Sequence, residues 1–389
     1  MRRPSRALPF ALGLSLTLSL NLSACGGGDE DGGDEGDGAE DGDTIGHESD
    51  TGDDESGESD SSDDADDTGE STTGEPDPGP AGIFVAVGDG GRRASSNDAL
   101  EWAEIVGSGV FDTQAEMGEE DILRAVAAGD GAVVAVGGGG VDWTGNAMVM
   151  RSTDGVNWDE DLVAGQEGVD GRKLYAVGYA DGSFVAGGAQ AHLIASSDGG
   201  QTWSSAYGEH HSYTPVHGVA GHGQIFVAVG EHRDEYDSPR VAYVHRSDDG
   251  GASFGAPSYF GEDGDFLRSV ASNGETFVAV GPRVCLRSAD GIDWQDCGLS
   301  ALEEFGAVSF TNDRFVVTYE DGLSTSSDGE SWSPHVESPT GVPAAMVYGN
   351  GVYAGLRYYD RGTSEALSEW SYVTHGSFPL RSLAFLPLE

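Results

Sequence analysis

Positive charge is scarce in this chain of 389 residues. It carries 19 Lys and Arg against 68 Asp and Glu, which gives a formal net charge of −49 at pH 7. A chain this acidic is repelled by the phosphates of nucleic acids and by anionic lipid surfaces. The composition therefore argues against nucleic acid as a partner and against adhesion to acidic membranes through the protein's own charge.

The usual spacings of metal and cofactor sites are also missing. Ten histidines are scattered along the chain without His-x-x-x-His or Cys–His spacing, so we predict no metal site of that kind. No glycine-rich stretch lies between a strand and a helix, so the glycines are interpreted as turns and not as phosphate loops. A Ca²⁺ site at Asp234-Glu235-Tyr236-Asp237 stays open, because oxygen ligands are plentiful there. No cofactor is expected.

Long hydrophobic runs are absent except at the N-terminus. There a positively charged hexapeptide precedes the apolar stretch Ala7 to Leu22, which is too short and wrongly flanked to span a bilayer and indicates a signal peptide. The tetrapeptide Leu22-Ser23-Ala24-Cys25 resembles a bacterial lipobox. That resemblance implies a signal peptide over residues 1–24, lipidation of Cys25 and a place in the bacterial cell envelope, on the outer membrane or cell surface more than on the inner membrane. An ordinary signal peptide cleaved near Ala24 is the alternative.

Cysteine occurs only three times, and three would leave one thiol unpaired in an exported protein. Lipidation of Cys25 leaves Cys285 and Cys297 as a pair. Residues that face each other across a hairpin have index numbers with a constant sum. Ser288 with Trp294 gives the same sum as Cys285 with Cys297, so we expect the two cysteines to lie within bridging reach and to form a disulfide in an oxidising compartment.

Large apolar residues are almost missing between Gly26 and Pro80, a tract with 23 Asp and Glu and no Lys or Arg. Such a tract cannot bury enough surface to offset its ordering entropy, and its charges repel one another. We interpret residues 25–80 as the lipidated cysteine and a disordered acidic linker. An acidic tail that captures cations or a basic partner is the alternative. When this tract and the three arginines of the signal peptide are left out, residues 81–389 carry a formal net charge of −29.

What the chain does contain is a repeat. Seven times a short apolar strand leads to a Ser-x-Asp turn, or to a degenerate copy of it, and then to an aromatic residue. The aromatic positions are Trp102, Trp158, Trp203, Phe254, Trp294, Trp332 and Trp370. A repeat of this length predicts a propeller or a solenoid. We expect the Ser and Asp side chains to accept hydrogen bonds from turn N–H groups and the aromatic ring to be buried, a structural role and not a catalytic one.

Each unit has four strand-like segments with Asn-Gly and Asp-Gly turns, which predicts one antiparallel propeller blade. The first unit, Ile83 to Trp102, has no first strand of its own. A spare segment at the C-terminus, Leu380 to Ala384, matches the first strands Leu123 to Ala127 and Leu267 to Ala271. We therefore expect an all-β fold over residues 81–389, a seven-bladed β-propeller whose C-terminal strand closes the first blade and removes the free sheet edges.

These motifs resemble the Asp-box (BNR) repeats of sialidase-like β-propellers, and their spacing is also similar to that of photosystem II assembly-factor-type propellers. Sialidases share an Arg-Ile-Pro segment, a carboxylate-binding arginine triad and a Tyr/Glu nucleophile pair. No Arg-Ile-Pro occurs here, and the nearest string, Ser238-Pro239-Arg240, lies in the wrong unit and in the wrong order. The resemblance thus implies the architecture; we assign no catalytic residue and expect no sialidase turnover.

One candidate binding site emerges when the second residues of the first strands are aligned. In blade order this column reads Arg381, Arg124, Tyr175, His217, Arg268, Gly306 and Ala344. Three arginines in an arginine-poor domain indicate a positive ring around the central channel. Guanidinium groups bind carboxylate, sulfate or phosphate in a bidentate manner. The alternative is that each arginine pairs with a neighbouring Asp or Glu.

Longer insertions are expected between the second and third strands of three units. They are Gly137 to Ala147, Glu231 to Val241 and Arg357 to Leu367. Inserted loops on a rigid scaffold often carry the binding residues. These would bring Trp143, Tyr236, Tyr358 and Tyr359 to the face of the arginine column, where aromatic rings suit stacking on a glycan or a peptide. Local packing of these side chains is the alternative.

The predicted function is that of a lipid-anchored, exported, non-catalytic binding or scaffold module. Its ligand would be a glycan, a peptide or a protein of the cell envelope, and its only contact with the membrane would be the lipid. One alternative is a sialidase-like glycoside hydrolase, which would need two carboxylates at glycosidase separation beside the arginine column. The other is an assembly factor for an envelope complex.

Overall fold

A computed structural model describes residues 81–105, 122–139, 146–159, 162–163, 171–207, 213–261, 264–299, 304–374 and 379–388. The predicted signal peptide, Cys25, the acidic tract and Trp143 lie outside the described residues. The described part consists of β-strands, turns and one short 3-10 turn at Ala189–Ala191. Within these ranges no helix is long and apolar enough to cross a bilayer.

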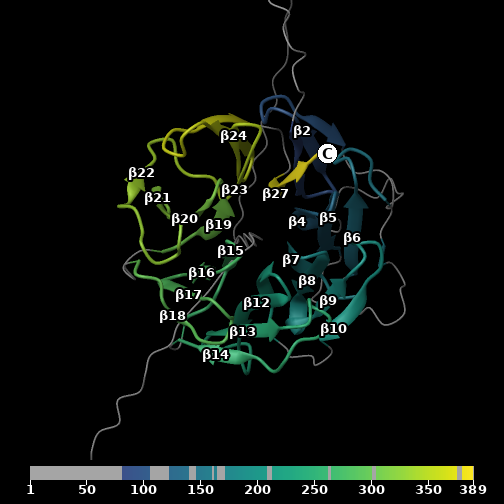
Figure 1. The fold of residues 1–389 in the computed structure, drawn as a ribbon, viewed down its shortest axis with the longest axis vertical. Coiled ribbons are helices and arrows are strands. Elements are labelled where there is room, and N and C mark those ends of the chain that lie inside the picture. Colours follow the sequence, from purple (N-terminus) through teal and green to yellow (C-terminus); the bar gives the residue numbers. More distant parts are fainter. Residues whose placement is uncertain are drawn as a thin grey trace, which may run out of the picture. The chain divides into compact units, whose positions relative to one another are not determined.

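The strands form seven antiparallel sheets arranged in a ring (Figure 1). Blade 1 contains β27 (Leu380–Pro387), β1 (Gly82–Gly88), β2 (Arg93–Ser96) and β3 (Ala103–Ile105). Blade 2 contains β4 (Ile122–Gly129), β5 (Ala132–Gly138) and β6 (Ala147–Ser152). Blade 3 contains β7 (Leu174–Ala180), β8 (Ser183–Gly188), β9 (Leu193–Ser196) and β10 (Ser204–Tyr207).

The other four blades each have four described strands. Blade 4 contains β11 (Val216–His222), β12 (Ile225–His232), β13 (Val241–Ser247) and β14 (Ser258–Phe260). Blade 5 contains β15 (Ser269–Ser272), β16 (Phe277–Gly281), β17 (Val284–Ser288) and β18 (Gln295–Asp296). Blade 6 contains β19 (Ala307–Thr311), β20 (Arg314–Thr318), β21 (Gly322–Ser326) and β22 (Val336–Glu337). Blade 7 contains β23 (Ala345–Gly349), β24 (Val352–Arg357), β25 (Asp360–Ser364) and β26 (Ser371–Thr374).

The ring closes through the C-terminal strand, as predicted. β27 pairs with β1 in antiparallel register from Gly82↔Pro387 to Gly88↔Leu380. The first strands of the seven blades, β27, β4, β7, β11, β15, β19 and β23, lie innermost and contact one another in that order around the centre (Figure 1). The seven-bladed β-propeller inferred from the repeats is therefore confirmed.

The Asp-box turns are joints within and between the blades. In the box of blade 2, Ser152 donates a hydrogen bond to Asp154 Oδ1 (3.0 Å), and the same oxygen accepts the N–H groups of Val156 (2.8 Å) and Asn157 (2.7 Å). Partial burial would raise the pKa of Asp154, but the hydrogen bonds from Asn157 and Val156 outweigh it and lower the pKa to about 2. The carboxylate is committed to its turn, which agrees with a structural role for the boxes.

Arginines that precede the box serine connect neighbouring blades. Arg151 Nε donates to the carbonyl of Gly199 (2.7 Å) in the next box, and Arg246 Nε donates to that of Asp290 (2.8 Å). The buried residues lie mostly between adjacent blades, such as Phe277 of blade 5 beside Val227 of blade 4 and Phe315 of blade 6. The core is thus a chain of interfaces between blades, and each blade depends on both of its neighbours.

The prediction of one of the three insertions is wrong. The segment from Arg357 to Leu367 was expected to be a long loop, but residues 360–364 form β25, so only Tyr358 and Tyr359 separate it from β24. The residues of β25 are too polar to give an alternating pattern. The strand is set by pairing with β24 and β26 and by the packing of Gly362 under Tyr372, where a Cβ would lie 2.6 Å from Tyr372 Cε1.

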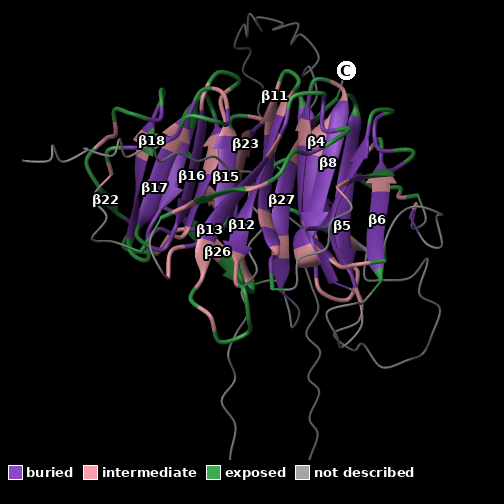
Figure 2. Ribbon diagram, turned by 90° about the horizontal axis from the view of Figure 1, so that it is seen from below, coloured by how far each residue is buried: buried purple, intermediate pink, exposed green. Residues whose placement is uncertain are grey.

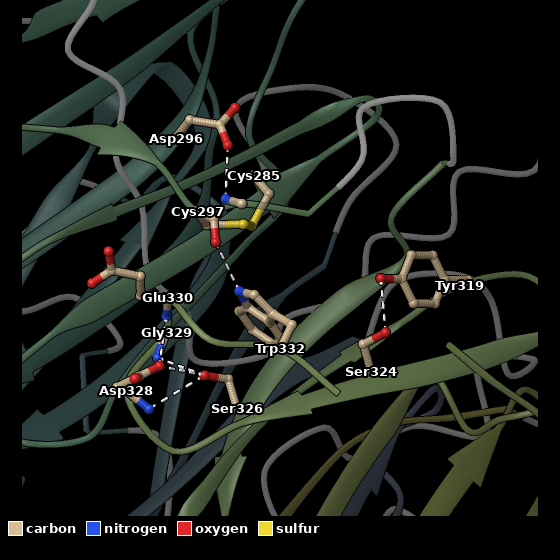
Figure 3. The surroundings of a disulfide bond; sticks show 11 residues. Cys285, Asp296, Cys297, Tyr319, Ser324, Ser326, Asp328, Gly329, Glu330 and Trp332 are labelled. Atoms are coloured by element: carbon tan, nitrogen blue, oxygen red, sulfur yellow. Dashed lines mark hydrogen bonds between the residues drawn. A yellow bond between two sulfur atoms is a disulfide. The ribbon is translucent and has the colours of Figure 1, made fainter. Parts of the chain in front are cut away.

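Cys285 and Cys297 are joined by a disulfide, with their Cα atoms 5.5 Å apart (Figure 3). The register Leu286↔Asp296 of β17 and β18 brings them opposite each other, and Cys297 N–H donates to the carbonyl of Cys285 (3.1 Å). Trp332 of blade 6 donates its indole N–H to the carbonyl of Cys297 (2.9 Å). The bond therefore supports the joint between blades 5 and 6 as well as one hairpin.

We expect the double variant Cys285→Ser/Cys297→Ser to unfold with a free energy lower by about 2–4 kcal/mol, the usual contribution of a disulfide that constrains the unfolded chain. Urea denaturation of the variant and of the wild-type protein under non-reducing conditions measures the difference. Reduced wild-type protein is the control and should match the variant. Two alkylatable thiols in the denatured, unreduced wild-type protein would contradict the pairing.

Candidate ligand-binding site on the loop face

The turns of the ring lie on two faces, and Figure 2 shows the strands running from one to the other. The Asp-box turns share a face with the turns between first and second strands, and we name it the box face. The connections between second and third strands share the other face with the entries to the first strands. We name this second face the loop face. Because the column residues stand at the entries to the first strands, they belong to the loop face.

Each large residue of the column occupies a β-bulge. The register shifts between Leu123 and Ala125 leave Arg124 as the extra residue, and the same shift occurs at the other column positions Tyr175, His217 and Arg381. In blade 5 both Arg268 N–H and the paired residue Ser269 face Val280. A bulge changes the direction of a side chain at the end of a sheet. All five side chains therefore leave the ladder at the same level of the ring.

A glycine opposite each bulge makes room for it. A Cβ at Gly281 would lie 1.7 Å from the carbonyl oxygen of Phe266, and one at Gly137 would lie 1.9 Å from that of Ile122. The equivalent glycines of the other three blades with a large column residue are Gly88, Gly188 and Gly230. The sequence signal was available: these glycines lie in the last three residues of the second strands, where we had interpreted them only as turns.

A buried carboxylate organises the loop face of blade 4. Glu231 is 8% exposed and has two arginines and a histidine around it: Arg233 at 3.1 Å, Arg240 at 3.4 Å and His217 at 3.8 Å. Burial would raise the pKa of Glu231, but the hydrogen bond and charge of His217 and the charges of Arg240 and Arg233 outweigh it and lower the pKa. Glu231 is thus an ionised hub, and sequence reasoning missed it because a single Glu at a strand end has no motif.

Two arginines share one phenyl ring beside this hub. The guanidinium carbon of Arg240 lies 4.6 Å from the ring centroid of Phe266, and that of Arg268 lies 5.1 Å from it. Arg268 is exposed, and within the described ranges its guanidinium has no hydrogen bond or ion pair; the charges that act on it belong to Glu304, Arg240 and Glu231. Stacking fixes the plane of the guanidinium and leaves its N–H donors available to a ligand.

Exposed tyrosines adjoin the hub. Tyr213 and Tyr236 are 41% and 63% exposed, and their rings meet edge to face with centroids 6.0 Å apart. Arg233, which pairs with Glu231, also donates to the carbonyl of Tyr236 (3.1 Å). The predicted aromatic residue of this loop therefore lies on the same ordered segment as the arginines. We name Glu231, Arg233, Arg240, Tyr213 and Tyr236 the blade 4 cluster.

The rest of the column forms a second group over blades 1 to 3. Arg381 makes two contacts with the carboxylate of Asp89, one of them from Nη2 at 2.9 Å, which is the pairing we had set out as the alternative. Arg124 lies over the ring of Tyr175 at 5.5 Å, and burial and then the charge of Arg381 lower its pKa. The column is thus divided: Arg268 is available to a ligand, whereas Arg381 is held by a carboxylate of its own blade.

Tyr358 and Tyr359 adjoin this second group. They are 39% and 38% exposed, their rings meet edge to face at 4.4 Å, and Tyr359 lies within electrostatic reach of Asp89. We name Asp89, Arg381, Tyr358 and Tyr359 the blade 7/1 cluster. Among the residues that the structure describes, no group of three or more His, Cys, Asp or Glu could hold a metal ion.

Comparison with known proteins supports the architecture alone. No protein-family model and no curated protein matches the chain. Among solved structures it is similar to YCF48 bound to D1 peptide, at 16% identity over 64% of this chain and 81% of that chain with a TM-score of 0.46. It is also similar to the GH74 enzyme of Niastella koreensis, at 15% identity over 76% of this chain and 42% of that chain with a TM-score of 0.46. The similarity to U3-55K is 9% identity over 79% of this chain and 92% of that chain with a TM-score of 0.50.

Proposed function

We propose that this protein is a non-catalytic binding module of the bacterial cell envelope, anchored by a lipid on Cys25, whose ligand presents an acidic group to the loop face of blades 4 and 5. The observation that carries the proposal is Arg268: exposed, stacked on Phe266 and outside any ion pair of the described residues. Arg240 lies on the same ring, so an oxyanion between the two guanidinium groups would relieve their repulsion.

The charge of the domain limits the kind of ligand. Residues 81–389 carry −29, so a dense polyanion would be repelled as it approached. A ligand with one or a few acidic groups escapes most of that repulsion, because surface charges are screened beyond roughly 8–10 Å at physiological salt. Peptides, envelope proteins and sparsely charged glycans meet this condition.

A sialidase-like hydrolase is supported less well. It would need an accessible nucleophile and a carboxylic acid whose pKa is raised into the working range. Sialidases use a Tyr/Glu nucleophile pair, and here the charge of Glu231 acts on Tyr243. That tyrosine is fully buried, and burial together with the charge of Glu231 raises its pKa well above the usual value. Every described Asp or Glu with a resolved pKa shift, Glu231 included, is shifted downward. These side chains favour binding over hydrolysis.

Replacement of Arg268 tests the proposal. Arrays of acidic peptides and acidic glycans are probed with the mature protein, and the Kd of the best ligand is then measured for each variant. Arg268→Ala should weaken binding about 10- to 150-fold, which corresponds to about 1.5–3 kcal/mol for hydrogen bonds to a charged group. Arg268→Lys should restore part of the affinity, because lysine lacks the planar fork.

Two control variants separate binding from stability. Arg314 is exposed on the box face, at the start of β20, so Arg314→Ala should change neither affinity nor melting temperature. Arg381→Ala should lower the melting temperature instead, because it leaves Asp89 without its partner. Unchanged affinity for every array ligand in Arg268→Ala would contradict the proposed function.

A further inference from the structure

The blade 4 cluster and the blade 7/1 cluster repeat one arrangement. In each, a carboxylate is held by arginine: Glu231 by Arg233 and Arg240, and Asp89 by Arg381. Each carboxylate adjoins a pair of exposed tyrosines in edge-to-face contact. Tyrosine and arginine are the residues that contribute most to binding energy at protein interfaces. The loop face therefore presents two tyrosine surfaces, and only the one on blade 4 has more arginines than carboxylates.

The two clusters lie on opposite sides of the central channel. In a ring of seven blades, blade 4 stands across from the junction of blades 7 and 1, and Figure 1 shows β12 and β13 on the far side of the ring from β24 and β27. Between the clusters stand His217, Tyr175 and Arg124 of the column. A ligand confined to one cluster could not reach the other, whereas an extended chain across the channel mouth could contact both.

The backbone of both tyrosine pairs is strained. Tyr213 has a φ of 60° and Tyr358 a φ of 50°, in the left-handed region that bulky side chains avoid. Such a conformation costs about 1–3 kcal/mol and persists only where the surroundings enforce it, most often at functional sites. The strained residue of each pair is exposed, Tyr213 by 41% and Tyr358 by 39%.

The channel below the mouth is uncharged. Its cavity of about 270 Å³ is lined by the inner strands of all seven blades, with small residues such as Ala127, Ala220 and Ala271 and with no charged side chain. A chain that crosses the mouth would lie above this uncharged cavity. It would meet exposed tyrosines at its two ends and the column residues Arg124, Tyr175 and His217 along one side.

We infer that the ligand is an extended polypeptide that lies across the channel mouth, with an acidic and apolar unit on the blade 4 cluster and a second apolar unit on the tyrosines of the blade 7/1 cluster. This inference rests on the proposed function, because the blade 4 cluster and Arg268 are the site named there. A polypeptide fits better than an anionic polysaccharide, because it places acidic groups only at selected positions. The formal net charge of −29 on residues 81–389 repels a regularly charged polymer. Rigid tyrosines give such a chain contact area at low entropic cost.

Synthetic peptides with one Glu-Phe unit and one Phe unit, separated by two, four, six or eight serines, test the inference. A peptide with the Glu-Phe unit alone and polygalacturonate are the comparisons. Binding to the mature protein is measured by fluorescence anisotropy. We expect affinity to pass through a maximum at one spacing, at least tenfold tighter than for the single-unit peptide, because the second contact becomes intramolecular. Tyr358→Asn/Tyr359→Ala should reduce that peptide to single-unit affinity; asparagine tolerates the left-handed conformation.

The variants separate the inference from the function on which it rests. Arg268→Ala should weaken both kinds of peptide, and Ile292→Ala, which removes an exposed apolar residue of the box face, should change neither. Affinity that is independent of spacing but still sensitive to Arg268 would overturn the inference and leave the proposed function standing. Insensitivity to Arg268 would overturn both. Tighter binding of polygalacturonate than of any peptide, lost in the tyrosine variant, would assign the surface to a glycan and overturn the polypeptide.

Discussion

Truncation after Phe378 is expected to abolish cooperative folding of the propeller. It removes β27, the inner strand of blade 1, and leaves the edge of β1 unpaired where the ring was closed. The buried side chains of Leu380, Leu383 and Leu386 go with it. At about 1.5–3 kcal/mol for each fully buried leucine, their loss alone amounts to about 5–9 kcal/mol. That is a large part of the 5–15 kcal/mol by which domains are usually stable.

Thermal melting followed by circular dichroism measures this effect. Two hydrogen bonds across the closure disappear as well, from Val126 N–H to Ser382 and from Arg381 to Asp89. A variant that lacks only Glu389, beyond the strand, is the matched control and should melt like the wild type. A truncated protein that melts cooperatively near the wild-type temperature would contradict closure by β27.

The architecture was predictable because its signals are local and repeated. Alternating apolar residues and Asp-Gly turns identify each hairpin, and the spare strand at Leu380 identifies the closure. Polar residues at strand positions gave the weakest signal: β25, from Asp360 to Ser364, has no apolar alternation and is defined by its neighbours. Hydrophobic periodicity identifies strands that bury apolar side chains on one face. It therefore misses β25, which is held by its strand pairing and by the packing of Gly362 under Tyr372.

The candidate site was predictable in part. Alignment of the repeats identified the column, but it could not show that Arg381 pairs with Asp89, 292 residues earlier in the chain, or that Arg268 has no such partner among the residues that the structure describes. Those pairings depend on which strand ends and loops meet when each blade folds. Glu231 escaped notice for the same reason: His217, Arg233 and Arg240 come from three different positions in blade 4, and only the fold brings them together.

Gly281→Ala/Gly137→Ala is expected to cost about 2–6 kcal/mol of stability. Neither glycine has a φ in the left-handed region, so the cost is steric: each Cβ would lie under 2 Å from a backbone carbonyl oxygen, that of Phe266 or that of Ile122. Overpacking of this kind costs about 1–3 kcal/mol per site. The sites lie in blades 5 and 2, far enough apart for their effects to add.

The single variants distinguish the fold from the site. Gly281→Ala displaces Phe266 and with it the stacked Arg268, so it should lose ligand affinity in addition to stability. Gly137→Ala should lose similar stability and keep the affinity of the blade 4 cluster. Gly255→Ala, where the nearest atom to the new Cβ is 3.9 Å away, should change stability by a few tenths of a kcal/mol only. Urea denaturation and the anisotropy assay measure the two effects separately. Equal affinity losses in Gly281→Ala and Gly137→Ala would mean that the bulges act on the whole loop face and do not position individual column residues.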